Sequence, residues 1–232
     1  MPHSVPVLSA GAAQGLITRA APLLLAQADA VVTGRFGAVG AMKEAFASGE
    51  PCDIIVLTAA MIDAMIAAGD AQRGSDAPLG TVFTGIAVPA GAAHPDVSDT
   101  PGLSAAFERA GSIWLPDIER STAGLHAIKV LRELGLAEKL SRRLRIFPNG
   151  ATAMRAMADS GEADAIGCTL LSESLVTQGV SAVGWLPSRF ELGTVYTAAV
   201  TARAQKPTLA RALIASLTAP AAAGLRRACG FE

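Results

Sequence analysis

Short β-branched and apolar runs alternate along this chain with longer segments of helical character. Alternation of this kind predicts βα units and a mostly parallel sheet. In the first part of the chain we expect strands at Pro6–Ser9, Ala30–Arg35 and Asp53–Leu57. Small residues and then a helix follow each strand, and these helices should start near Ala12, Val39 and Ala60. In open α/β sheets, ligands bind outside the carboxyl ends of the strands, where these loops lie.

A longer β-prone run, GTVFTGIAVPAG, leads into the turn-rich segment HPDVSDTPG, and we expect a domain boundary there. A second βα series follows. Its strands are predicted at Ser112–Pro116, Leu144–Phe147, Ala163–Cys168 and Val180–Leu186, and its helices at Thr122–Leu134, Ala151–Ser160 and from Leu171. The run GTVYTAAVT is expected to be a strand that returns to the first lobe, followed by helices at Pro207–Leu217 and about Pro220–Ala228.

The expected architecture is α/β with two lobes, each a mostly parallel sheet flanked by helices. Lobe 1 is discontinuous and comprises residues 1–84 and 193–232, whereas lobe 2 comprises residues 85–192. Two crossovers join the lobes, so we expect a ligand cleft between them.

Composition and charge exclude several functions for the 232-residue chain. Hydrophobic residues make up 51% of it, but no run approaches the roughly 18 apolar residues of a membrane span, so we expect no membrane insertion. The formal net charge of −1 gives no basic field for nucleic acid, which is therefore not an expected partner. Three widely spaced cysteines indicate buried thiols, neither a disulfide framework nor a metal pair.

Neither a metal site nor a cofactor is predicted, because no histidine has Cys, Asp or Glu neighbours at metal-ligand spacing. The segment MPHSVPVLSAG enters a strand almost at once and contains no export leader. We therefore expect the chain as written to be cytoplasmic, and periplasmic if a leader has been removed from it. A monomer is expected.

The segment PDIERSTAGLHAIK indicates where a ligand binds, because a strand there runs through a polar loop into a helix. Ser121 or Thr122 can cap this helix, whose first amides lack intrahelical partners and favour an anion. Arg120 adds a positive charge where an acidic residue is usual, and a bound anion would explain it. The alternative for Arg120 is a solvated side chain.

Five segments together are similar to periplasmic molybdate-binding proteins and their relatives: VLSAGAAQGL, GAVGAMKEAFASGEPCDIIVLTA, PDIERSTAGLHAIKVLRELG, ATAMRAMADSGEADAIGCT and LRRACGF. The resemblance covers nearly the whole chain. It implies the type II periplasmic-binding fold, in which two α/β lobes enclose a ligand cleft. If the protein is exported, it also implies a transporter partner.

Members of this family hold a tetrahedral oxyanion with hydroxyls and backbone amides. The two hydroxyl positions of lobe 1 fall here on Ala12 and about Val39, and a tyrosine position of lobe 2 falls on Thr169. The small residue that opens the lobe 2 helix matches Ala123, and the next backbone donor matches about Ala151. Two or three hydroxyl partners are therefore missing, which argues against molybdate.

We expect instead a small organic acid with two or three carboxylates, because arginine grips a planar carboxylate with two parallel hydrogen bonds. The molybdate or oxyanion transport component is the second alternative. The predicted ligand-binding residues are Ser9, Gly11, Thr58, Arg120, Ser121, Thr122, Ala123, Thr169 and Tyr196. Several have structural alternatives: a tight turn for Gly11, helix caps for Thr58, Ser121, Thr122 and Thr169, and packing for Tyr196.

A branch of the same family includes aconitate isomerase, and the GTVFTGIAVPAGA and STAGLH segments suggest kinship. Such an enzyme shifts a double bond and needs a base near the carbon acid, for which His126 and Glu173 are the candidates. His126 can instead lie at the surface or at the interface between the lobes, and Glu173 can be an acid in the first turn of a helix. Three functions stay open: a solute receptor, an isomerase and a cytoplasmic ligand sensor.

Overall fold

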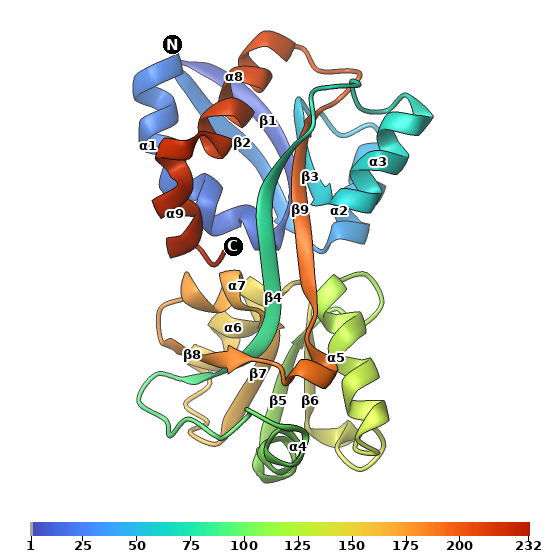
Figure 1. Ribbon diagram of the computed structural model, residues 1–232, viewed down its shortest axis with the longest axis vertical. Coiled ribbons are helices and arrows are strands. Elements are labelled where there is room, and N and C mark those ends of the chain that lie inside the picture. Colours follow the sequence, from blue (N-terminus) through green and yellow to red (C-terminus); the bar gives the residue numbers. More distant parts are fainter. Residues whose placement is uncertain (1) are drawn as a thin grey trace. The chain divides into compact units, whose positions relative to one another are not determined.

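The computed structural model describes residues 2–232, apart from the side chain of Gln27. It divides the chain into two compact units (Figure 1). Unit 1 comprises the residues up to Val82 together with Thr194–Glu232, and unit 2 comprises Phe83–Gly193. The chain passes from unit 1 to unit 2 within strand β4 (Ala77–Pro89) and returns at the start of strand β9 (Gly193–Val200).

Unit 1 is built from alternating strands and helices, and the helices cover both faces of its sheet. Its first part contains β1 (His3–Ala10), the 3₁₀ turn η1 (Gly11–Ala13), α1 (Gln14–Ala28), β2 (Ala30–Gly37), α2 (Val39–Ala47), β3 (Ile54–Thr58) and α3 (Ala59–Ala68). After β9 it continues with α8 (Pro207–Thr218), η4 (Pro220–Ala222) and α9 (Ala223–Ala228). The strand order is β2-β1-β3-β9, in which β1, β2 and β3 are parallel and β9 is antiparallel to β3.

Unit 2 is also built mainly from alternating strands and helices. Its elements are α4 (Thr100–Arg109), β5 (Ser112–Pro116), α5 (Thr122–Glu133), η2 (Ser141–Arg143), β6 (Leu144–Phe147), α6 (Gly150–Asp159), β7 (Ala165–Leu170), α7 (Leu171–Leu175), β8 (Val180–Trp185) and η3 (Ser188–Phe190). The strands follow the order β8-β4-β7-β5-β6, with β7, β5 and β6 parallel and β4 antiparallel to both its neighbours.

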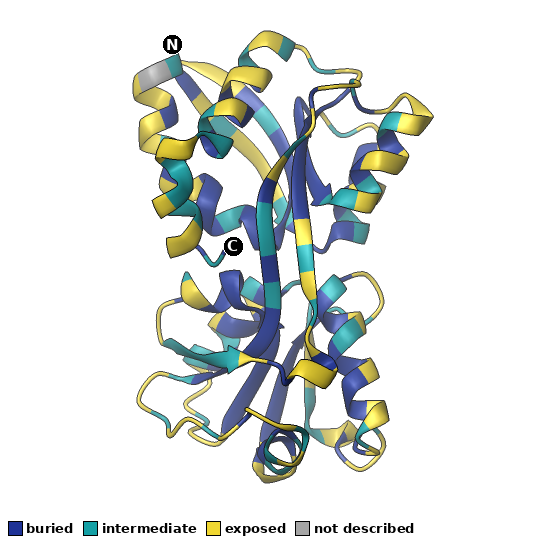
Figure 2. Cartoon of the chain, viewed as in Figure 1, coloured by how far each residue is buried: buried dark blue, intermediate teal, exposed yellow. Residues whose placement is uncertain are grey.

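Two apolar clusters form the core of unit 2, one on each face of its sheet. The larger cluster packs Ile86, Ile113 and Cys168 against α4 and against Ala127 and Leu131 of α5. The smaller one packs Ala87 and Trp114 against Met154 and Met157 of α6. Figure 2 shows the buried strands and the exposed outer faces of these helices. The face covered by α5 and the face covered by α6 are therefore distinct, a distinction on which the site depends.

Several predicted elements differ from the structure. The sequence does not predict helix α4, because the Pro- and Gly-containing DTPG segment is typical of a turn. In the structure Asp99 caps this helix by accepting from the Gly102 N–H at 2.8 Å. The helix predicted from Ala12 begins as the 3₁₀ turn η1, and the helix predicted at Pro220–Ala228 is divided into η4 and α9. Strand β7 lies two residues further along than predicted, at Ala165–Leu170.

Among residues 2–232, no single helix has the length and apolar character to cross a membrane. The bent pair Pro207–Thr218 and Pro220–Ala228 meets those criteria, by length and composition alone.

Candidate functional site

In unit 2 the first turns of α5, α6 and α7 lie at one edge of the sheet, because each helix follows a strand of the parallel set β5, β6 and β7. Amides in the first turn of a helix have no intrahelical acceptors. These first turns therefore bring helix N-terminal amides together at one edge of the sheet. Most of the residues predicted to bind ligand in lobe 2 lie here.

The loop before α5 is folded tightly around Asp117. Its Oδ1 accepts from the N–H groups of Glu119 at 2.8 Å and Arg120 at 2.9 Å, and its carbonyl accepts from the Ser121 N–H at 3.1 Å. Gly124 is required because a Cβ there would lie 2.1 Å from the Asp117 carbonyl oxygen. The loop is thus pressed against the first turn of α5, and the hydrogen bond to Asp117 holds the backbone of Arg120, an exposed residue, in place.

Ser121 is the N-cap of α5, as the sequence predicted for Ser121 or Thr122. Its Oγ accepts from the Gly124 N–H at 3.4 Å, and the residue is buried. Thr122 and the buried Ala123 are the first two residues of the helix. The first turn of α5 therefore combines a serine cap, early helix amides and a neighbouring arginine.

The first turn of α6 is already occupied by a carboxylate of the protein itself. Glu173, on α7, accepts from the Thr169 hydroxyl at 2.6 Å and from the backbone N–H groups of Gly150, Ala151 and Leu170. Only glycine fits at position 150, since a Cβ would lie 1.9 Å from Glu173 Oε2. Asn149 completes the cap of α6 by accepting from the Thr152 N–H at 2.9 Å.

The environment of Glu173 perturbs its titration. Burial raises the pKa of this carboxyl, and the Thr169 hydroxyl and the three backbone N–H groups offset part of that rise. Glu173 is 4% exposed, so it lies inside the unit and not at the rim of a site. The amide of Ala151, matched in the sequence to an oxyanion donor, is thus engaged by Glu173.

The other predicted base, His126, holds α5 to a neighbouring segment. Its Nε2 lies 2.7 Å from the Phe190 carbonyl oxygen, and because a carbonyl only accepts, Nε2 is the donor. The thiol of Cys168 is inert, since burial raises its pKa to about 12.

In unit 1 the predicted residues lie at the carboxyl ends of neighbouring parallel strands. Ser9 is buried at the end of β1, and its hydroxyl donates to the Ala10 carbonyl at 2.9 Å. Gly11 opens the turn η1. Thr58 is the N-cap residue of α3 but makes no capping hydrogen bond with its side chain, and it pairs across β3 and β9 with the buried Tyr196.

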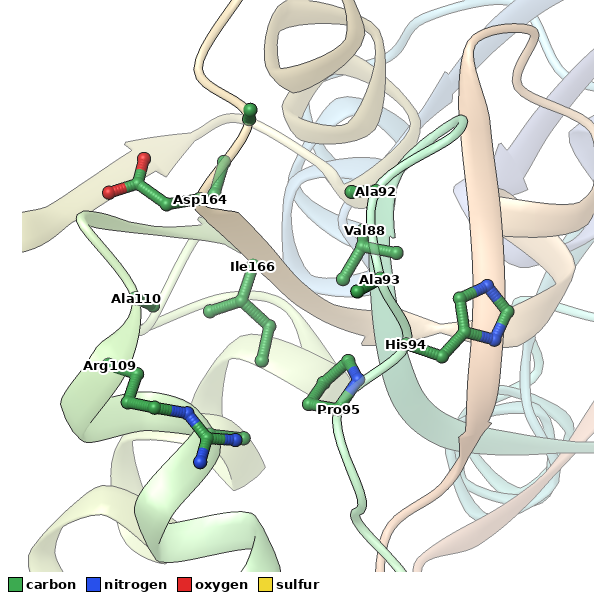
Figure 3. A pocket seen from close by; sticks show the side chains of 12 residues that line it. Val88, Ala92, Ala93, His94, Pro95, Arg109, Ala110, Asp164 and Ile166 are labelled. Carbon is green, nitrogen blue, oxygen red and sulfur yellow. The ribbon is translucent and has the colours of Figure 1, made fainter.

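The cavity in Figure 3 belongs to unit 2 but lies at the other end of its strands, beside the start of β7 and the end of β4. Its volume is about 250 Å³, and Val88 and Ile166 line it. It contains none of the predicted site residues. Among residues 2–232, no cluster of three or more His, Cys, Asp or Glu side chains could hold a metal ion.

The family model for the bacterial extracellular solute-binding protein matches residues 5–232. The chain belongs to this family. One relative of this solute-binding protein is an aconitate isomerase from a Pseudomonas species, 28% identical over 226 residues that cover 95% of this chain and 84% of the relative.

Solved structures of periplasmic binding proteins share the fold, which confirms the predicted class. The Azotobacter vinelandii periplasmic molybdate-binding protein superposes with a TM-score of 0.80 at 20% identity, and the match covers 98% of each chain. The sulfate-binding protein of Mycobacterium tuberculosis H37Rv gives a TM-score of 0.75 at 17% identity, covering 99% of this chain and 86% of that one. A periplasmic thiamin binding protein gives 0.70 at 14% identity, covering 99% and 82%.

Proposed function

We propose that this solute-binding protein binds a small organic anion with two or three carboxylates, held in unit 2 by Arg120 and the first turn of α5. The observation that carries the proposal is the position of Glu173. Its carboxylate takes the amides of Gly150 and Ala151, so the first turn of α6 has no such donors left for an external oxyanion.

A tetrahedral oxyanion such as molybdate suits these surroundings poorly. The N-cap residues before η1 and α2 are Ala10 and Ala38, which have no hydroxyl, and the matched positions Ala12 and Val39 are apolar. Each neutral donor missing from a buried anion costs roughly 1–3 kcal/mol of binding free energy.

A carboxylate suits the first turn of α5 and the neighbouring Arg120 better than a tetrahedral oxyanion does. The guanidinium of arginine donates two parallel hydrogen bonds to a planar carboxylate, and early helix amides hold a second one. Thr122 and Ala123 supply such amides in the first turn of α5. Ser9, Gly11, Thr58 and Tyr196 remain our proposed contributors from unit 1, and Thr169 acts through Glu173.

A second candidate, an isomerase acting on an aconitate-like acid, is favoured by the relative named aconitate isomerase. The step would remove a proton from a carbon next to a carboxylate and return a proton at the other end of the allylic system, with no redox change. The raised pKa of Glu173 suits a base better than His126, whose Nε2 donates to a carbonyl.

If the protein binds without turnover, we infer that it serves as the receptor of a membrane transporter and works outside the cytoplasm. The family description supports that role. Turnover would instead support the isomerase.

The proposal is tested on the purified protein with trans-aconitate, citrate and molybdate. We expect the two carboxylic acids to raise the midpoint of thermal unfolding and molybdate to raise it less, because a ligand that binds only the folded state stabilises it. A proton NMR time course on the trans-aconitate sample separates binding from isomerisation. Stabilisation by molybdate alone would contradict the proposal.

Replacing Arg120 by alanine should weaken carboxylate binding by roughly tenfold or more, because it removes a charge-assisted pair of hydrogen bonds. Isothermal titration with trans-aconitate measures the affinity. Arg132→Ala is the matched control, since Arg132 is an exposed arginine in the last turn of the same helix. Equal affinities for the two variants would refute the role of Arg120.

A further inference from the structure

Thr84, on β4, is a fully buried threonine whose hydroxyl has no hydrogen-bond partner among the described residues. Its backbone groups are both satisfied: the N–H donates to the Leu192 carbonyl at 3.0 Å, and the carbonyl accepts from the Leu186 N–H at 3.3 Å. Buried hydroxyls without a partner are destabilising and uncommon in native proteins. No hydrogen bond within the described part of the chain compensates for the burial of the Thr84 hydroxyl.

The strand register shows on which face of the sheet this hydroxyl lies. Thr84 is opposite Leu170 in the antiparallel pair of β4 and β7, and Gly85 is opposite Thr169. Side chains alternate between faces along a strand, and directly opposite residues share a face. Ile86, two residues beyond Thr84, belongs to the core beneath α5, so Thr84 faces the α5 side.

The register also places Thr84 at the edge of the sheet that carries the candidate site. Leu170 is the last residue of β7, and β7 is parallel to β5, which α5 follows. The first turn of α5 therefore begins at the same edge and on the same face as the hydroxyl of Thr84. Thr169 and Glu173 face the opposite side, where Glu173 meets the start of α6.

We propose that Thr84 is a ligand-binding residue whose hydroxyl donates a hydrogen bond to a carboxylate of the acid held by α5. The inference rests on the proposed function and names a further contact of the same site. Thr169, the threonine predicted from the sequence for this role, is committed to Glu173. Thr84 supplies on the α5 face the hydroxyl that Thr169 does not.

Three variants test the assignment. Thr84→Val replaces the hydroxyl with a methyl group of similar size, Thr84→Ser keeps the hydroxyl, and Ser174→Ala removes another buried hydroxyl without a partner, on α7. Isothermal titration gives the affinity for trans-aconitate, and urea unfolding of the ligand-free protein gives stability. If Thr84→Val does not fold, Thr84→Ala takes its place.

We expect Thr84→Val to lower the affinity roughly 10- to 100-fold, the range for a lost hydrogen bond to a charged group. Thr84→Ser should stay within about threefold of the wild type, and Ser174→Ala should match it, since neither loses the contact. Ligand-free Thr84→Val should be at least as stable as the wild type, because it no longer buries an unsatisfied hydroxyl.

The outcomes separate the two proposals. If the wild type binds neither trans-aconitate nor citrate, the proposed function fails and this inference fails with it. If the wild type binds and Thr84→Val binds equally well, only the role of Thr84 is overturned. Lower stability of Thr84→Val with unchanged affinity would also overturn it, because the hydroxyl would then serve the fold.

Discussion

Glu173 accepts four hydrogen bonds while it is almost completely buried. It reaches the N–H of Leu170, the N-cap of its own short helix, from the third helical position, as the glutamate of a capping box does. The same carboxylate also caps α6. The Glu173 side chain therefore links the N-termini of α6 and α7 to β7. Its protonation state consequently affects the stability of unit 2.

Replacing Glu173 by glutamine should change how stability depends on pH. A glutamate in the unfolded chain titrates near pH 4.3, and burial raises the pKa in the folded state. Between these two values the folded state binds more protons than the unfolded state, so the contribution of Glu173 to stability falls as the pH rises. Relative to the wild type, Glu173→Gln should therefore gain stability as the pH rises above the pKa of glutamate in the unfolded chain.

Urea unfolding at several pH values measures this difference. Glu191→Gln, at an exposed position, is the control, and its stability curve should run parallel to that of the wild type. A constant difference between Glu173→Gln and the wild type across the range would contradict the prediction.

The pairing of Thr169 with Glu173 shows the limit of sequence reasoning at the scale of single residues. The sequence singled out both side chains, but for separate roles. Their contact depends on the approach of Gly150, which lies 23 residues before Glu173 and belongs to another helix. Thr84 was missed because a lone threonine in an apolar strand is unremarkable until its burial and its lack of a partner are seen.

At the scale of elements, helix α5 and the loop before it form one unit of the candidate site. Ser121 caps the helix, and Asp117 closes the loop. Gly124, which has no Cβ, allows the loop backbone at Asp117 to pack directly against the first turn of the helix. The sequence predicted β5 and β6 with the bounds found and the correct first residue of α5, because cap, loop and apolar run are all local signals. It missed α4, whose start carries residues equally typical of turns.

Gly124→Ala should destabilise the protein by roughly 2 kcal/mol or more, because the new methyl group would overlap the Asp117 carbonyl oxygen and push the loop away from α5. Urea unfolding gives the change in the free energy of unfolding. Gly224→Ala on α9 is the control: apart from its chain neighbours and the backbone of its own helix, no described atom lies within 4 Å of its Cβ position. Alanine there should be neutral or stabilising by up to about 1 kcal/mol. Similar effects of the two substitutions would contradict this account.

At the scale of the whole molecule, the two units differ in how the chain builds them. Unit 2 is one continuous stretch, whereas unit 1 needs both ends of the chain. Strand β3 pairs with β9 from Ile54 to Thr58, and Thr81 on β4 exchanges two backbone hydrogen bonds with Glu232, each 2.9 Å long. The first part of unit 1 therefore lacks several of its partners without residues 194–232.

Residues 83–193 expressed alone should fold, because they contain both apolar clusters and all the strand pairs of unit 2. We expect one cooperative urea transition with a slope of about 1–1.5 kcal/mol/M, as for a domain of this size. Residues 2–82 expressed alone are the comparison and should show no cooperative transition. Cooperative folding of residues 2–82, or none of residues 83–193, would contradict this expectation.

The discontinuity of unit 1 also has a consequence for the newborn chain. A ribosome delivers residues in order, so all of unit 2 emerges before β9 does. Unit 2 can therefore complete its fold during translation. Strands β1, β2 and β3 of unit 1 are synthesised earlier, but β9, the antiparallel partner of β3, is synthesised only after unit 2. Until β9 arrives, the open side of β3 is an unpaired strand edge, the kind of surface that chaperones protect.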